Sequence, residues 1–186
     1  MKKGLIFLAI LLLLVGCGNK EEIDTEKIYA QITVKDYGTM KLELYPELAP
    51  ETVKNFVTLA EEGFYDGNSF HRIIDGFMIQ GGMDRSGTVQ PIKGEFASNG
   101  FENPVKHKDG VISMARASGN NDSATSQFFI MVGDGHWLDG EYAAFGKVIE
   151  GYEIAKKIAA NAKPVDDNGT IAPEEQPIIE SVRILK

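Results

Sequence analysis

The middle of the chain consists of short apolar runs that Gly, Asn and Asp interrupt again and again. Between residues 69 and 147 these runs read FHRII, FMIQGG, GVISMAR, SQFFIMV and AAFGKVI. Runs of this length with frequent turn residues between them are typical of strands in a β-sandwich or a β-barrel. The chain is therefore expected to be mainly β.

The segments on either side of this middle section contain both strands and helices. Residues 27–46, KIYAQITVKDYGTMKLELYP, alternate on both sides of a glycine, which predicts a β-hairpin with its turn at Lys35–Gly38. Its apolar residues are expected to form one face of each strand: 28, 30, 32 and 34, then 40, 42 and 44. Residues 50–62 have apolar side chains at helical spacing, with Pro50 at the start and Gly63 just after the end, so a helix is expected there.

The C-terminal part repeats this combination of helix and strand. Residues 150–163, EGYEIAKKIAANAK, predict a second helix, and residues 178–185, IIESVRIL, predict a closing strand. Strands at both ends and two helices would thus frame a β-rich middle. A closed antiparallel barrel is the expected arrangement, because closure leaves no free strand edge.

The N-terminus has the form of a secretory signal peptide. Lys2 and Lys3 precede an apolar run, Leu5–Val15, which is shorter than the ~20 residues that cross a bilayer. The run ends in the sequence LVGC, which resembles the bacterial lipobox, and in that motif the cysteine is lipidated and becomes the mature N-terminus. Cys17 is thus the expected lipidation site, and an uncleaved anchor or an incidental thiol are the alternatives.

This N-terminus defines the expected domain organisation and location. We predict a signal peptide at 1–16, a lipidated N-terminus with a polar flexible tether at 17–26, and one domain at 27–186. The protein would be extracytoplasmic and lipid-anchored to the bacterial cell membrane. Cys17 is the single cysteine, so no disulfide can form within the chain. The net charge is −8, and removal of Lys2 and Lys3 makes it −10, which argues against a nucleic-acid partner.

Four segments together resemble the cyclophilins, a family of peptidyl-prolyl isomerases. They are FHRIIDGFMIQGG, GVISMARA, SQFFI and WLDGEYAAFGKV, and the resemblance covers nearly all of the chain after the tether. IKGEF and NPVKHKDGVISMARA look more similar to bacterial than to eukaryotic cyclophilins. The resemblance implies a closed eight-stranded antiparallel β-barrel capped by two α-helices. It also implies catalysis of cis–trans isomerisation at X–Pro bonds.

Such a reaction makes modest chemical demands on a site. Rotation about the X–Pro bond crosses a barrier of ~18–20 kcal/mol because amide resonance is lost, yet no bond breaks. Neither a nucleophile nor a metal nor a cofactor is needed; the site needs a pocket for the proline ring and a donor that favours the twisted amide. Arg72 is always charged and offers five N–H groups in a fixed fork. The alternative is that Arg72 is a structural residue in a salt bridge.

The magnitude of the required stabilisation is within reach of one donor. Uncatalysed exchange takes ~10–100 s, and reaching an enzyme rate of ~10 s⁻¹ lowers the barrier by about 4 kcal/mol. One well-placed donor in a dry site supplies ~2.7–4 kcal/mol. Arg72 alone is therefore sufficient in principle.

The resemblance also assigns the site residues. The implied catalytic residues are Arg72, Gln80 and Phe77, and the implied substrate-binding residues are Phe77, Met78, Ala115, Arg116, Ala117, Gln127, Phe129, Trp137, Leu138 and Tyr142. A straight strand would point Phe77 and Met78 to opposite faces. The family site therefore requires a bend or bulge near Gly76 or near Gly81–Gly82.

Three features depart from the familiar eukaryotic pattern. Arg116 stands where that pattern has Asn, and Tyr142 stands where it has His. The loop MDRSGTVQPIKGEF lacks the usual cluster of glycines and is expected to border the subsite for residues before proline. The histidines are scattered, so no metal site is expected, and His71 is expected to be a buried structural or supporting residue.

Three hypotheses follow for the function. The first is an isomerase that acts on proline-containing unfolded or exported polypeptides as a monomer, with cyclosporin-like ligands as further partners because of Trp137. The second is a catalytically weak proline-peptide-binding chaperone or scaffold at the membrane surface. The third is a structural lipoprotein whose barrel merely resembles the family. The intact set of pocket residues favours the first.

Overall fold

The structure is a computed structural model and describes residues 27–185. The predicted signal peptide, the tether and Cys17 therefore lie outside the described residues. Within the described range, no helix is both long enough and apolar enough to cross a membrane.

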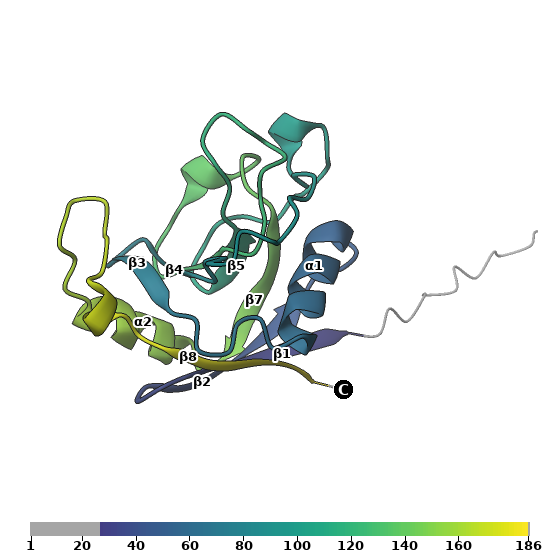
Figure 1. Cartoon of the computed structure of the whole chain (residues 1–186). Coiled ribbons are helices and arrows are strands. Elements are labelled where there is room, and N and C mark those ends of the chain that lie inside the picture. The colour runs from purple at the N-terminus through teal and green to yellow at the C-terminus, as the bar shows by residue number, and fades with distance from the viewer. Residues whose placement is uncertain (1–26, 186) are drawn as a thin grey trace, which may run out of the picture.

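Eight antiparallel strands form one curled sheet, which Figure 1 shows with its two helices. The strands are β1 (Ile28–Val34), β2 (Gly38–Leu44), β3 (Phe70–Ile74), β4 (Met78–Gly81), β5 (Val111–Met114), β6 (Phe128–Met131), β7 (Ala144–Glu150) and β8 (Ile179–Leu185). Their order in the sheet is β3-β4-β6-β5-β7-β2-β1-β8. The mainly β fold with eight antiparallel strands is confirmed.

The prediction of a closed barrel is wrong, because the sheet is a half-barrel that stays open between β3 and β8. The two edge strands do not pair along their length: the contact is limited to the isolated bridge Ser69↔Ile178 and to a few backbone hydrogen bonds around it, such as Phe70 N–H to the Pro177 carbonyl at 3.0 Å. The outer edge of β3 is occupied by a loop instead: Ile73 N–H donates to the Gly169 carbonyl at 2.8 Å, and Ile171 N–H donates to the His71 carbonyl at 3.0 Å. That loop takes the hydrogen-bonding groups that β8 would have needed for closure.

The hairpin and both helices form where they are expected. β1 and β2 pair in register from Ile28↔Leu44 to Val34↔Gly38, and their alternate apolar residues are buried. Helix α1 spans Pro50–Glu61 and α2 spans Tyr152–Asn161, at opposite ends of the curled sheet (Figure 1). Three short 3₁₀ helices lie in the loops: η1 (Ala97–Asn99), η2 (His136–Leu138) and η3 (Pro173–Glu175).

The sheet has two apolar faces, and each carries its own hydrophobic cluster. The inner face holds the main core, in which the α1 residue Phe56 contacts the rings of Tyr65, Phe128 and Phe145 at centroid distances of 5.2–5.7 Å. The outer face carries a second, smaller cluster: Met78, Val111, Phe129, Met131, Leu138 and Ala144. Alternation along β6 separates them, because Phe128 points inward and its neighbour Phe129 points outward.

A distant carboxylate caps helix α1. The N-cap residue, Ala49, offers no side-chain acceptor. Glu95 fills this role: its carboxylate accepts hydrogen bonds from Glu51 N–H at 2.9 Å, Thr52 N–H at 2.8 Å and the Thr52 hydroxyl at 2.6 Å. Because Glu95 is only 2% exposed, these bonds are shielded from water, and they satisfy backbone donors that every helix start leaves free.

Candidate active site on the outer face of the sheet

The strand register brings the candidate residues into one row on the outer face. Arg72 of β3 pairs with Gln80 of β4, Gln80 pairs with Phe129 of β6, and Phe129 pairs with Ser113 of β5. Residues directly opposite in antiparallel strands point to the same side of the sheet. Three neighbouring strands thus place a cation, an amide and an aromatic ring side by side.

The expected bend occurs at Gly76, before β4 begins. Gly76 has φ +73°, and the turn is closed by a hydrogen bond from Phe77 N–H to the Ile74 carbonyl at 3.0 Å. Phe77 therefore precedes the strand and does not follow its alternation, whereas Met78 and Gln80 share one strand face. This geometry lets all three side chains line one hollow.

That hollow contains most of the residues expected for the site. It is lined by Arg72, Phe77, Met78, Gln80, Ala115, Arg116, Phe129, Leu138 and Tyr142, and its volume is about 140 Å³. An apolar cavity of roughly 150 Å³ accepts a benzene-sized ring, so this hollow is large enough for the five-membered ring of proline. Trp137 lies at the rim, where its half-exposed indole packs against Phe77 at a centroid distance of 5.4 Å.

Arg72 has no acidic partner among the described residues, which excludes the structural salt bridge there. Its Nη1 donates to Gln80 Oε1 at 3.2 Å and lies 3.9 Å from the Met78 sulfur. Its Nε donates to the carbonyl of Asn168 at 2.7 Å, while Nη2 donates to no residue in the described range. The guanidinium is thus held at Nε and Nη1. Among residues 27–185 its charge stays unpaired, and its remaining N–H groups are free on the side that faces the hollow.

The Asn168 contact is a feature that sequence reasoning missed. The loop between α2 and η3 reaches across β3 and makes an isolated bridge between Arg72 and Thr170. Gly169 permits this approach: it has φ +85°, and a side chain there would begin 2.5 Å from the Ile74 side chain. The only signal in the sequence is the Asn-Gly pair, which marks a turn but not the place where that turn packs.

A chain of amides leads from Arg72 to a second hollow. Gln80 accepts from Arg72 and donates through Nε2 to Gln127 Oε1 at 2.9 Å. This hollow, of about 240 Å³, adjoins the first and is lined by Gln80, Ala115, Arg116, Ala117, Ser123, Thr125 and Gln127. The loop 83–96, which is expected to border this subsite, contributes no residue to the lining, but its Ile92 N–H donates to the carbonyl of Ala124, between the lining residues Ser123 and Thr125, at 2.8 Å.

Arg116 and Tyr142, two of the three departures from the eukaryotic pattern, contact each other. The Arg116 guanidinium lies 4.8 Å from the centre of the Tyr142 ring and 5.3 Å from the centre of the Phe96 ring. It also donates from Nε to the Glu141 carbonyl at 3.0 Å. Tyr142 in turn packs edge-on against Phe129 at 5.8 Å. Arg116 and Tyr142 therefore form a packed cation–aromatic unit in the wall of the hollow.

The environment of His71 determines the charge of its ring. His71, beside Arg72, is half-buried, and burial lowers its pKa, so its ring is neutral near pH 7. Its Nδ1 has no hydrogen-bond partner in the described range. Residues 27–185 contain no group of three His, Cys, Asp or Glu side chains placed to hold a metal ion.

Comparison with known proteins agrees with the fold. Residues 29–184 match the family described as cyclophilin type peptidyl-prolyl cis-trans isomerase/CLD. Peptidyl-prolyl cis-trans isomerase A of Dickeya dadantii is 44% identical over 163 residues, with 80% of each chain covered. Peptidyl-prolyl cis-trans isomerase B of Escherichia coli is 40% identical over 162 residues, which cover 80% of this chain and 95% of that relative.

A solved structure shows the same arrangement of strands and helices. The cyclophilin type peptidyl-prolyl cis-trans isomerase of Cryptosporidium parvum, crystallised in the presence of the dipeptide Ala-Pro, superposes with a TM-score of 0.72 at 32% identity. It covers 85% of this chain and 99% of its own. The fold defines a cyclophilin-like β-protein, and the chain belongs to the cyclophilin family of peptidyl-prolyl cis-trans isomerases.

Proposed function

We propose that this cyclophilin-family isomerase uses Arg72 to stabilise the twisted X–Pro amide while the hollow beside it holds the proline ring. Family membership supports the isomerase activity itself. Phe77, Met78, Phe129 and Leu138 supply the apolar contacts around the ring, and the free N–H groups of Arg72 face the amide. When the amide twists, its nitrogen regains a lone pair, which a guanidinium stabilises more than it stabilises the planar state.

The observation that carries this proposal is the environment of Arg72. An arginine held by a neutral amide and a backbone carbonyl, at the wall of an apolar hollow, keeps its full positive charge for a ligand. Gln80 fixes its direction and is itself fixed by Gln127. Ala115, Arg116 and Ala117 lie where an extended peptide would continue along the second hollow, and Trp137 stands at the rim.

The direct test is the rate of cis-to-trans relaxation of an X–Pro peptide with residues 27–186. We expect relaxation much faster than the uncatalysed ~10–100 s at 25 °C. A protein that binds the peptide but leaves this rate unchanged would instead support the alternative, a proline-peptide-binding chaperone or scaffold. Cyclosporin added to the same assay reports whether the Trp137 rim and the Tyr142 wall accept that ligand.

The proposed setting is the outer side of a bacterial membrane. The signal-peptide pattern and the lipobox at Cys17 support a lipid anchor, and the polar segment 18–26 would serve as a tether. Proline-containing exported polypeptides are then the natural substrates, since isomerisation needs neither ATP nor a cofactor. We propose that the protein acts as a monomer.

Cys17→Ser provides the test of the anchor. In a bacterial host that processes lipoproteins, the wild type should sediment with membranes, and the variant should not acquire lipid. Mass spectrometry of the mature N-terminus should find diacylated Cys17 in the wild type, because about 0.8 kcal/mol per buried CH₂ makes two acyl chains a stable anchor. An unmodified Cys17 in membrane-bound wild type would contradict the lipoprotein proposal.

A further inference from the structure

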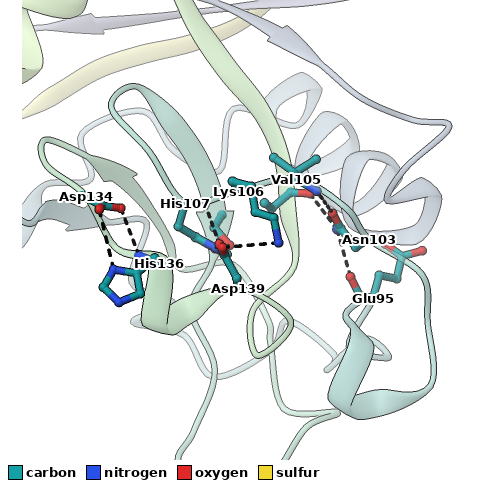
Figure 2. Close-up of polar contacts among 10 residues, drawn as sticks. Glu95, Asn103, Val105, Lys106, His107, Asp134, His136 and Asp139 are labelled. Atoms are coloured by element: carbon teal, nitrogen blue, oxygen red, sulfur yellow. Dashed lines mark hydrogen bonds and ion pairs between the residues drawn. The ribbon is translucent and has the colours of Figure 1, made fainter.

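An Asp–His–Ser chain lies directly behind the hollow, with its His and Ser buried and its Asp partly exposed. His107 Nδ1 is 3.1 Å from Asp139 Oδ1, and His107 Nε2 is 3.1 Å from the Ser113 hydroxyl. The His107 backbone N–H also donates to Asp139 Oδ1 at 2.8 Å. Figure 2 shows the Asp139 carboxylate between His107 and Lys106, whose Nζ is 3.5 Å from Oδ2.

The donors and acceptors in this chain have fixed roles. An ionised Asp139 can only accept, so Nδ1 of His107 carries the proton. In the neutral ring Nε2 is then the acceptor, and the Ser113 hydroxyl donates to it. Burial is the largest influence on the His107 ring and lowers its pKa, while the bonds to Asp139 oppose that shift.

Each end of the chain touches a wall of the hollow. The His107 ring is stacked on Phe129, with 6.0 Å between centroids and 20° between planes. Ser113 is the direct strand partner of Phe129. At the other end, Asp139 follows Leu138, which lines the hollow at the end of η2. The polar chain therefore ties the floor of the hollow, Phe129, to its side wall, Leu138.

The same three residue types form nucleophilic triads in hydrolases, but this chain is closed to substrate. Ser113 and His107 are both 0% exposed, and the Phe129 ring covers the imidazole on the side of the hollow. A nucleophile must reach the atom that it attacks. The arrangement therefore suits support of the hollow and not bond cleavage.

We propose that His107 and Asp139 are positioning residues that set the shape of the proline-binding hollow by holding Phe129 and Leu138 at a fixed distance from each other. The proposal rests on the proposed function, because it assumes that the hollow is where proline binds. It assigns no contact between these two residues and the substrate. Their effect should thus appear in how well the peptide binds, while Arg72 governs the twisting step.

A neutral His107 is part of this arrangement. Protonation would turn Nε2 into a donor and deprive the Ser113 hydroxyl of its only acceptor in the described range. The charged groups that face the ring are Asp139 and, beyond it, Lys106. Because the folded pKa lies below the ordinary imidazole value of about 6.5, the folded state resists protonation, and its stability decreases as the pH falls from 6.5.

The test compares two variants that disturb the chain in different ways. His107→Phe keeps a ring on Phe129 but removes both nitrogens, and Asp139→Asn keeps an oxygen acceptor but removes the charge. In the X–Pro assay at 10 °C we expect KM to rise about 10-fold in both, a moderate effect for misplacement of supporting groups, while kcat stays within about 2-fold. Circular dichroism confirms the fold of each variant.

The matched control is the exposed pair beside the chain. Asp134 and His136 lie 3.6 Å apart at the surface of the same loop, as Figure 2 shows. Asp134→Asn should leave both kinetic constants unchanged. Wild-type KM should rise as the pH falls through the folded-state pKa of His107, which burial lowers below the ordinary imidazole value, and this rise should be absent in His107→Phe.

Three results would overturn the proposal. One is an unchanged KM in both folded variants, and another is a fall in kcat alone. The third is a rise of KM at low pH that persists in His107→Phe, which would assign the titration to another group such as His71. Should the wild type show no catalysis, the peptide Kd replaces KM in the same comparison. The positioning role is then judged separately from the isomerase activity.

Discussion

Arg72→Ala is expected to lower kcat/KM for X–Pro isomerisation about 10²–10³-fold, the loss that follows removal of one transition-state donor in a shielded site. This corresponds to ~2.7–4 kcal/mol of transition-state stabilisation. The loss should lie in kcat, because the apolar walls that seat the proline ring remain. The measurement is cis-to-trans relaxation of an X–Pro peptide at 10 °C.

A lysine at this position tests whether charge alone is sufficient. Arg72→Lys keeps the positive charge but loses the fork that reaches the Asn168 carbonyl and Gln80 at the same time. We expect it to recover only a small part of the activity. Arg85→Ala removes an exposed arginine and serves as the matched control, with unchanged rates. Full activity of Arg72→Ala, with the fold intact, would show that another group stabilises the twisted amide.

Glu95→Ala is expected to cause a large loss of stability. The substitution leaves two backbone N–H groups at the start of α1 and the Thr52 hydroxyl without their acceptor, in a place that water does not reach freely. Losing hydrogen bonds to a charged group costs roughly 1.5–3 kcal/mol, so the free energy of unfolding should fall by about 3 kcal/mol. For a protein of this size, Tm should then fall by roughly 6–12 °C.

Two further variants separate the cap from a general effect of charge. Glu95→Gln keeps one acceptor oxygen and should lose about half as much stability, since its amide also brings N–H groups towards other donors. Glu102→Ala removes an exposed carboxylate from the same region and should change the unfolding free energy by less than about 0.5 kcal/mol. Equal losses from Glu95→Ala and Glu102→Ala in urea unfolding would contradict the capping role.

Much of the fold could be predicted from the sequence because it depends on neighbouring residues. The alternation in residues 27–46 determines the β1–β2 hairpin, and apolar spacing with Pro50 and Gly63 determines the extent of α1. The identity of the site residues came from the four family motifs, and nine of those residues line one hollow. The need for a bend beside Phe77 followed from strand alternation combined with the site that the family resemblance implies, and Gly76 supplies the bend.

The remaining features depend on which distant segments pair, and local patterns do not encode that. Register across three strands puts Arg72, Gln80 and Phe129 in one row on the outer face. The Asn168 carbonyl that holds Arg72 lies 96 residues further along the chain, and the same loop occupies the edge of β3 that a closed barrel would need. Sequence by itself thus determined the elements and the chemistry of the site. Only the tertiary structure decided how the guanidinium is held and where the sheet stays open, because hydrogen bonds between distant segments form only when the whole chain has folded.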